Sequence, residues 1–99
     1  MAKGYWIAHV TIHDPEGYKK YIAANAAPLA KYGARFVVRS GQHEIPVGSM
    51  PAGQRHVVIE FDSFERAKAC FHSPEYQAAG KIRDQTSTAN IVIIEGYEG

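Results

Sequence analysis

Residues 5–16, YWIAHVTIHDPE, join a strand pattern directly to a helix start. Aromatic and β-branched residues dominate the first part, which predicts a strand over residues 5–12. Asp14 is a suitable N-cap, and Pro15 suits the first position of the helix that follows. Along this helix, apolar residues recur at a spacing of three and four until Gly33, which supplies the stop. These apolar positions are Tyr18, Tyr21, Ile22, Ala26 and Leu29.

Further strands and a second helical region follow. Ser63 can cap a helix, and Ser73, which precedes Pro74, marks a second helix start. The segment 41–53 is rich in glycine and proline, which is typical of a long connection between two strands. Runs of β-branched and aromatic residues predict three more strands, over residues 35–39, 55–61 and 91–95.

The predicted order is β, α, β, long connection, β, α, β. Two right-handed crossovers on one sheet give an α+β, ferredoxin-like βαββαβ fold. Its four-stranded antiparallel sheet carries the helices on one face. We expect a single domain over residues 1–99, because a chain of this length has no room for a second core.

Charge and composition exclude several classes of function. The net charge is +1, and Lys19-Lys20 is the nearest approach to a basic run, so we expect no nucleic-acid partner. No apolar stretch approaches the roughly 20 residues that a membrane span needs, so we expect no membrane association. Cys70 is the only cysteine, which precludes an intrachain disulfide. We therefore expect a cytoplasmic protein.

The two faces of the predicted sheet differ in character. One face is wholly apolar and should pack under the helices. It collects Trp6, Ala8, Val10, Ile12, Phe36, Val38, Val57, Ile59, Phe61, Val92 and Ile94. The other face is mixed, with Tyr5, Ile7, His9, Thr11, Arg35, Val37, Arg39, His56, Val58, Glu60, Ile91, Ile93 and Glu95. This second face is too apolar for a solvent-facing sheet, so we expect a homodimer that pairs through it.

A set of short motifs along the chain carries a family resemblance. They are Tyr5-Trp6-Ile7, Asp14-Pro15-Glu16, Tyr18, Tyr21, residues 33–41, Glu60-Phe61, Ser73-Pro74-Glu75-Tyr76-Gln77, Arg83 and Glu95-Gly96. Through them the chain resembles the bacterial family catalogued as domain of unknown function 1330, within the dimeric α+β-barrel superfamily. The resemblance covers essentially the whole chain, with Ala34 and Ser40 standing where glycine is expected. It implies a homodimer whose two sheets form a barrel with the helices outside, and it implies no particular reaction.

Two clusters are candidate ligand-binding sites. Arg39, His56, Glu60 and His9 share the mixed face, where an arginine could bind an acidic substrate while a histidine moves a proton. The alternative is an Arg39–Glu60 ion pair within an interface, with the histidines filling space.

The second cluster consists of Ser73, Tyr76 and Arg83. Tyr76 and Arg83 are seven residues apart and share one helical face, where a phenol and a guanidinium could hold a carboxylate or an enolate. The alternative gives Ser73 a capping role and Tyr76 a core position with its hydroxyl satisfied. We predict no metal site, because His9 and His13 would lie roughly 13 Å apart on a strand, and we expect no cofactor.

The sequence does not identify catalytic residues. We expect a small homodimeric protein that binds a small organic molecule, acidic or aromatic. The alternative is an enzyme that resembles the cofactor-free monooxygenases or isomerases of the wider superfamily. Whether the ligand pocket lies between sheet and helices or between two sheets is left open.

Overall fold

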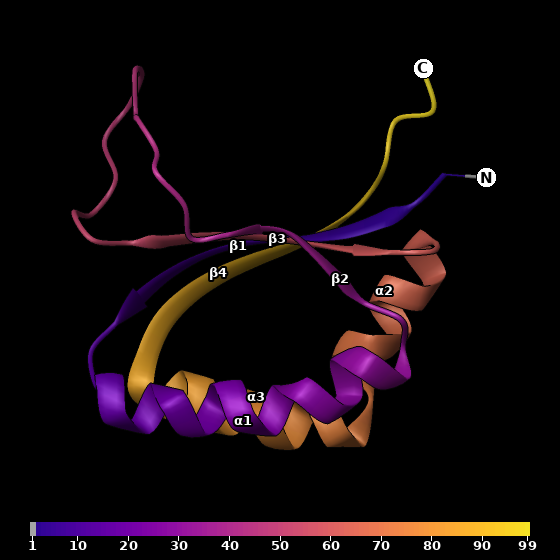
Figure 1. Ribbon diagram of the computed structural model, residues 1–99, viewed down its shortest axis with the longest axis horizontal. Helices are drawn as coiled ribbons and strands as arrows, with labels where there is room; N and C mark the ends of the chain where they lie inside the picture. The colour runs from indigo at the N-terminus through magenta and orange to yellow at the C-terminus, as the bar shows by residue number, and fades with distance from the viewer. Residues whose placement is uncertain (1) are drawn as a thin grey trace.

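The predicted α+β fold is confirmed by a computed structural model, which describes residues 2–99. A four-stranded sheet has the order β2-β3-β1-β4, and each neighbouring pair is antiparallel. The helices lie together on one side of this sheet (Figure 1). In chain order the elements are β1 (Gly4–Ile12), α1 (Pro15–Lys31), β2 (Arg35–Arg39), β3 (Arg55–Phe61), α2 (Phe64–His72), α3 (Pro74–Thr86) and β4 (Ser87–Glu95).

The predicted caps begin the three helices. The Asp14 side chain accepts a hydrogen bond from Gly17 N, Ser63 accepts from Arg66 N, and Ser73 accepts from Tyr76 N. After α1, Gly33 has a φ of 72°, the left-handed conformation that favours glycine. Local sequence signals therefore set the ends of the helices.

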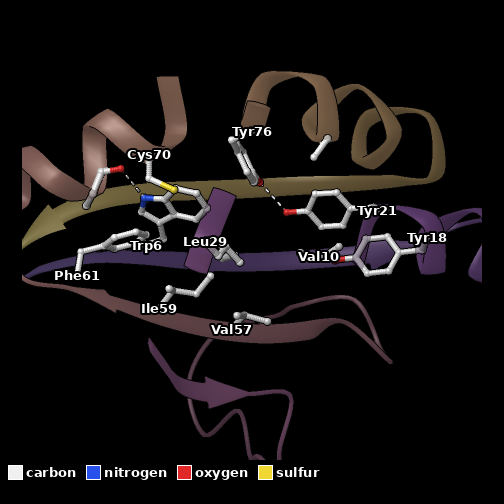
Figure 2. Packing of buried hydrophobic residues seen from close by; sticks show 13 residues of the cluster. Trp6, Val10, Tyr18, Tyr21, Leu29, Val57, Ile59, Phe61, Cys70 and Tyr76 are labelled. Atoms are coloured by element: carbon white, nitrogen blue, oxygen red, sulfur yellow. Dashed lines mark hydrogen bonds between the residues drawn. The ribbon is translucent and has the colours of Figure 1, made fainter. Parts of the chain in front are cut away.

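The core is aromatic and lies between the sheet and the helices. Trp6 is 2% exposed, and its indole Nε1 donates to the Ala67 carbonyl at 2.9 Å (Figure 2). Phe61 and Tyr76 pack against its ring at centroid distances of 5.1 and 4.8 Å. Cys70 is buried beside them, and burial raises the pKa of its thiol to about 11. The thiol therefore stays protonated and contributes packing.

Strand β4 presents the opposite faces from those predicted. Ile91 and Ile93 pair with Ala8 and Trp6 and pack against the core, whereas Val92 and Ile94 are 51% and 46% exposed on the other face. The prediction was wrong here because residues 91–94 are all apolar, so their alternation carries no information. The pairing with β1 decides which of them face inward.

A β-bulge in β2 moves Arg39 to the helix-covered face, and the predicted position of Arg39 beside Glu60 is wrong. Phe36 pairs with Ile59, but the register then shifts, so that Arg39 pairs with Val57. Val57 faces the core, and its cross-strand partner faces the same way. The extra residue, Val37, reverses the alternation for the rest of the strand.

The molecule is a slab of 36 × 34 × 17 Å. Within residues 2–99, no helix covers the outer face of the sheet, the face opposite the helices (Figure 1). The connection between β2 and β3 and the segment after β4 project on that side, at opposite ends of the sheet. Among the described residues, no helix is long and apolar enough to cross a membrane.

Candidate functional site

A cleft lies between the inner, helix-covered face of the sheet and helices α1 and α3. Its enclosed volume is about 40 Å³, enough to hold water but not an aromatic ring. The side of the cleft at β2 is formed by exposed residues of an edge strand. The cleft as a whole is lined by Trp6, Ala8, Val10, Tyr18, Tyr21, Ile22, Asn25, Phe36, Arg39, Arg55, Val57, Ile59, Tyr76, Arg83 and Ile91. We call this the inner cleft.

Three guanidinium groups line the inner cleft. Arg39 lies 4.2 Å from the ring centroid of Phe36, and Arg55 lies 5.8 Å from that of Tyr18. Neither arginine forms an ion pair within residues 2–99. The Nε of Arg55 is shielded from solvent and has no hydrogen-bond partner among the described residues. A buried unsatisfied donor is costly, so this side of the cleft favours an anion.

The third guanidinium belongs to a hydrogen-bonded group on the helices. Arg83 Nη1 donates to the Tyr76 hydroxyl at 2.8 Å, which lies 2.6 Å from the Tyr21 hydroxyl. The two phenols point toward one another from α3 and α1 (Figure 2). The predicted pairing of Tyr76 with Arg83 on one helical face is confirmed as geometry. Arg83 also contacts Asp84, at 3.1 Å, and its side chain is 12% exposed.

Burial controls the protonation of these phenols. It raises the pKa of Tyr76 far above its ordinary value, and the neighbouring Tyr21 adds to the shift. Burial also raises the pKa of Tyr18. Tyr76 and Tyr18 therefore remain protonated at neutral pH and serve as hydrogen-bond donors, not as bases.

Three histidines, His9, His43 and His56, lie together on the outer face, away from the inner cleft. His9 Nδ1 and His56 Nδ1 lie 2.9 Å apart, and the ring of His43 lies 4.5 Å from that of His56. Partial desolvation lowers the pKa of His56, and the charges of His43 and His9 lower it further. The predicted proximity of His9 and His56 is confirmed, but Arg39 is not beside them.

Glu60 also lies on the outer face, and its arginine partner is Arg35. Arg35 Nε donates to Glu60 at 2.9 Å, and the Tyr5 hydroxyl donates at 3.0 Å. The bond from Arg35 is the main reason that the pKa of Glu60 is lowered. Arg35 also contacts Asp62 at 3.1 Å. The first predicted cluster is thus divided between the two faces of the sheet.

Arg55 and Asn25 are cleft residues that the sequence interpretation missed. Arg55 has the same strand parity as the core residues Val57 and Ile59, so alternation alone could have placed it inside. Asn25 lies one helical turn after Tyr21, on the buried side of α1. Among residues 2–99, no three His, Cys, Asp or Glu side chains form a group suited to a metal ion.

Solved structures share this fold at low sequence identity. A protein of unknown function from Rhodopseudomonas palustris matches with a TM-score of 0.76 and 15% identity, over 99% of this chain and 85% of that one. SnoaB, a cofactor-independent oxygenase from Streptomyces nogalater, matches with a TM-score of 0.69 and 13% identity, over 100% and 97%. A dimeric protein of unknown function with a ferredoxin-like fold, from Bacteroides fragilis, matches with a TM-score of 0.52 and 20% identity, over 94% and 95%.

These identities establish the fold and nothing finer. No curated protein matches the chain significantly. The model of the family described as domain of unknown function (DUF1330) matches residues 3–97. The chain therefore belongs to the DUF1330 family.

Proposed function

We propose that the protein binds a small aromatic acid in the inner cleft, and that it does so without catalysing a reaction. The observation that carries this proposal is the pair of unpaired guanidinium groups, Arg39 and Arg55, beside an apolar and aromatic wall. A carboxylate would accept from both arginines, including the unsatisfied Nε of Arg55. The planar body of the ligand would lie against Phe36 and Tyr18.

The cleft volume of about 40 Å³ is too small for an aromatic ring, so the ligand would enter at the β2 edge by displacing side chains there. Phe36 is 41% exposed there, and Arg39 is exposed as well. We propose that both side chains move outward on binding, since neither belongs to the buried cluster around Trp6. A ligand ring would then fill the space between the edge strand and α1, and burial of its apolar area would favour binding.

The chemistry of the cleft favours binding over catalysis. Proton abstraction from a substrate needs a base within hydrogen-bond reach. Among the described residues that line the cleft, none is His, Cys, Asp or Glu. The raised pKa of Tyr76 keeps its phenol protonated. An oxygenase such as SnoaB shares the fold, but the described residues of this cleft offer no base that would support the same activity here.

Titration calorimetry with benzoate tests the proposal, with neutral benzamide as the matched control ligand. We expect benzoate to bind and benzamide to bind much more weakly. Arg39→Gln and Arg55→Gln should each weaken benzoate binding by about tenfold or more, since each removes a hydrogen bond to a charged group. Arg35→Gln, which alters an arginine on the outer face of β2, should leave the affinity unchanged. Equal binding of both ligands, or a loss confined to Arg35→Gln, would contradict the proposal.

We further propose that two copies pair through their outer faces as a homodimer. Val38, Val92 and Ile94 are 42%, 51% and 46% exposed on this face, around the half-buried Ile7 and Val58. The chain exposes 6267 Å², against roughly 5,600 Å² for a typical monomer of this mass. The dimeric protein from Bacteroides fragilis with this fold supports the proposal.

A further inference from the structure

The hydroxyl groups of Tyr21 and Tyr76 have two protons, and only one of these is donated in a hydrogen bond within this group. A guanidinium only donates, so the Tyr76 oxygen accepts the bond from Arg83 Nη1. Each phenol brings one proton, and one of the two lies in the Tyr21–Tyr76 bond. Whichever tyrosine donates in that bond, the proton of the other has no acceptor within residues 2–99.

The uncommitted O–H belongs to a group that lines the inner cleft. Tyr76 is fully buried and Tyr21 is 7% exposed, so bulk water does not readily satisfy this donor. A buried donor without an acceptor is unfavourable. The Arg83 guanidinium lies directly behind the phenols, and its positive charge favours an acceptor that is negative. Asp84 offsets only part of the positive charge of Arg83, because the Asp84 side chain is 72% exposed to solvent.

The phenols and the unpaired arginines come from different sides of the cleft. Arg39 and Arg55 belong to β2 and β3, at one edge of the sheet. Tyr76 and Arg83 belong to α3, which contacts α1 and β4, the strand at the other edge. Helix α1 contacts both sides, because the Tyr18 ring lies 5.8 Å from Arg55 and 5.2 Å from the ring of Tyr21, which bonds Tyr76. Asn25, one turn after Tyr21, adds a polar side chain to the same wall. A single ligand can therefore be held at two separate points.

We propose that the Tyr21–Tyr76–Arg83 group binds a second oxygen of the ligand, opposite its carboxylate. The ligand class is then an aromatic acid that carries a hydroxyl or carbonyl oxygen at its far end. This inference rests on the proposed function, because it assumes that the carboxylate occupies Arg39 and Arg55. The spare phenolic proton donates to the second oxygen, and Arg83 stabilises any negative charge on it.

Calorimetry with 4-hydroxybenzoate and 4-methylbenzoate tests this inference, because the two probes have similar size and differ in the second oxygen. The wild-type chain should bind 4-hydroxybenzoate about tenfold more tightly, the value expected for one hydrogen bond near a charge. The double variant Tyr21→Phe with Tyr76→Phe has no phenolic proton, so it should lose this preference and still bind 4-methylbenzoate. Tyr5→Phe, a matched change on the outer face, should keep the preference.

A spectroscopic measurement separates recognition from a packing effect. The absorbance of bound 4-hydroxybenzoate should report a phenol pKa below that of the free probe, and the double variant should abolish that shift. If 4-methylbenzoate binds equally well to the wild type, the second binding point is wrong while the cleft proposal stands. If neither probe binds, both proposals are wrong. Binding of 4-methylbenzoate also shows that the double variant is folded. If the double variant does not bind 4-methylbenzoate, the single variant Tyr21→Phe is tested in its place. If that variant also fails to bind 4-methylbenzoate, the phenols pack the cleft and the inference is overturned.

Discussion

Ser40, the residue after β2, has a left-handed backbone with a φ of 55°. This conformation costs a residue with a Cβ up to about 1–2 kcal/mol, whereas glycine adopts it freely. The Ser40 amide donates to the His56 carbonyl at 3.0 Å, so the ladder holds the residue in place. Glycine is also the residue that the family resemblance leads one to expect at this position.

Ser40→Gly should therefore raise the free energy of unfolding by up to about 1 kcal/mol, measured by chemical denaturation. Ser49→Gly is the control, because Ser49 lies in the exposed connection without a left-handed backbone. The control should be neutral or slightly destabilising, since glycine increases the entropy of the unfolded chain. If Ser40→Gly destabilises the protein as much as the control does, the backbone at residue 40 is not strained.

His56 gives the stability a pH dependence. Its pKa is lowered in the folded protein relative to the ordinary value of 6.5, so the unfolded chain binds the proton more readily. The stabilisation is complete above pH 6.5 and is lost as the pH falls from there toward the folded pKa. Thermal unfolding followed from about pH 7.5 to about pH 5 should show a falling midpoint.

A matched pair of variants assigns this pH dependence. His56→Gln should reduce it, whereas His13→Gln, which alters an exposed histidine, should retain it. Contradiction would come from a midpoint that rises on acidification, or from equal profiles for the wild type and His56→Gln.

At the scale of elements, β2 gives the inner cleft one of its arginines. The bulge at Val37 lies on an edge strand, where an extra residue is tolerated because only one neighbour must pair. Without Val37, Phe36 would pair with Ile59 and the next residue with Val58, in a regular ladder. The register of Arg39 with Val57 would then be unchanged.

Deletion of Val37 should thus leave a folded protein in which Arg39 still faces the inner cleft. The affinity for benzoate should match that of the wild type, measured by calorimetry. A loss of affinity equal to that of Arg39→Gln would contradict this, because it would mean that Arg39 had shifted to pair with Val58 on the outer face.

Elements with strong local signals were predictable from the sequence, and strand faces were predictable only in part. Asp14, Ser63 and Ser73 cap helices through contacts within three residues, so local sequence determines them. β1 and β3 alternate clearly between polar and apolar residues, and their faces follow. The faces of β4 and of the second half of β2 depend on pairing with other strands.

The candidate site was predictable to a similar extent. The pairing of Tyr76 with Arg83 follows from their spacing on one helix, and the proximity of His9 to His56 follows from strand alternation. The place of Arg39 in the cleft depends on a bulge, which no residue in Phe36-Val37-Val38 announces. The packing of β2, α1 and α3 around one cleft depends on tertiary structure, which the periodicity of the sequence does not predict.

At the scale of the whole molecule, the uncovered outer face accounts for the proposed dimer. We expect sedimentation to give a dimer at micromolar concentration. Val58→Asp should dissociate it, because the charge would be buried without a partner at the centre of the interface. Ala78→Asp adds the same charge to an exposed position on α3 and should leave the dimer intact. A monomeric wild type, or a dimeric Val58→Asp variant, would contradict the outer-face interface.

The proposed ligand lies between the sheet and the helices, in the inner cleft. The most direct measurement is a titration of ¹⁵N-labelled protein with benzoate, followed by NMR of the arginine side chains. We predict that the Nε–H resonances of Arg55 and Arg39 shift in a saturable manner while those of Arg35 do not. Shifts confined to Arg35, His9 and His56 would place the ligand on the outer face and contradict this account.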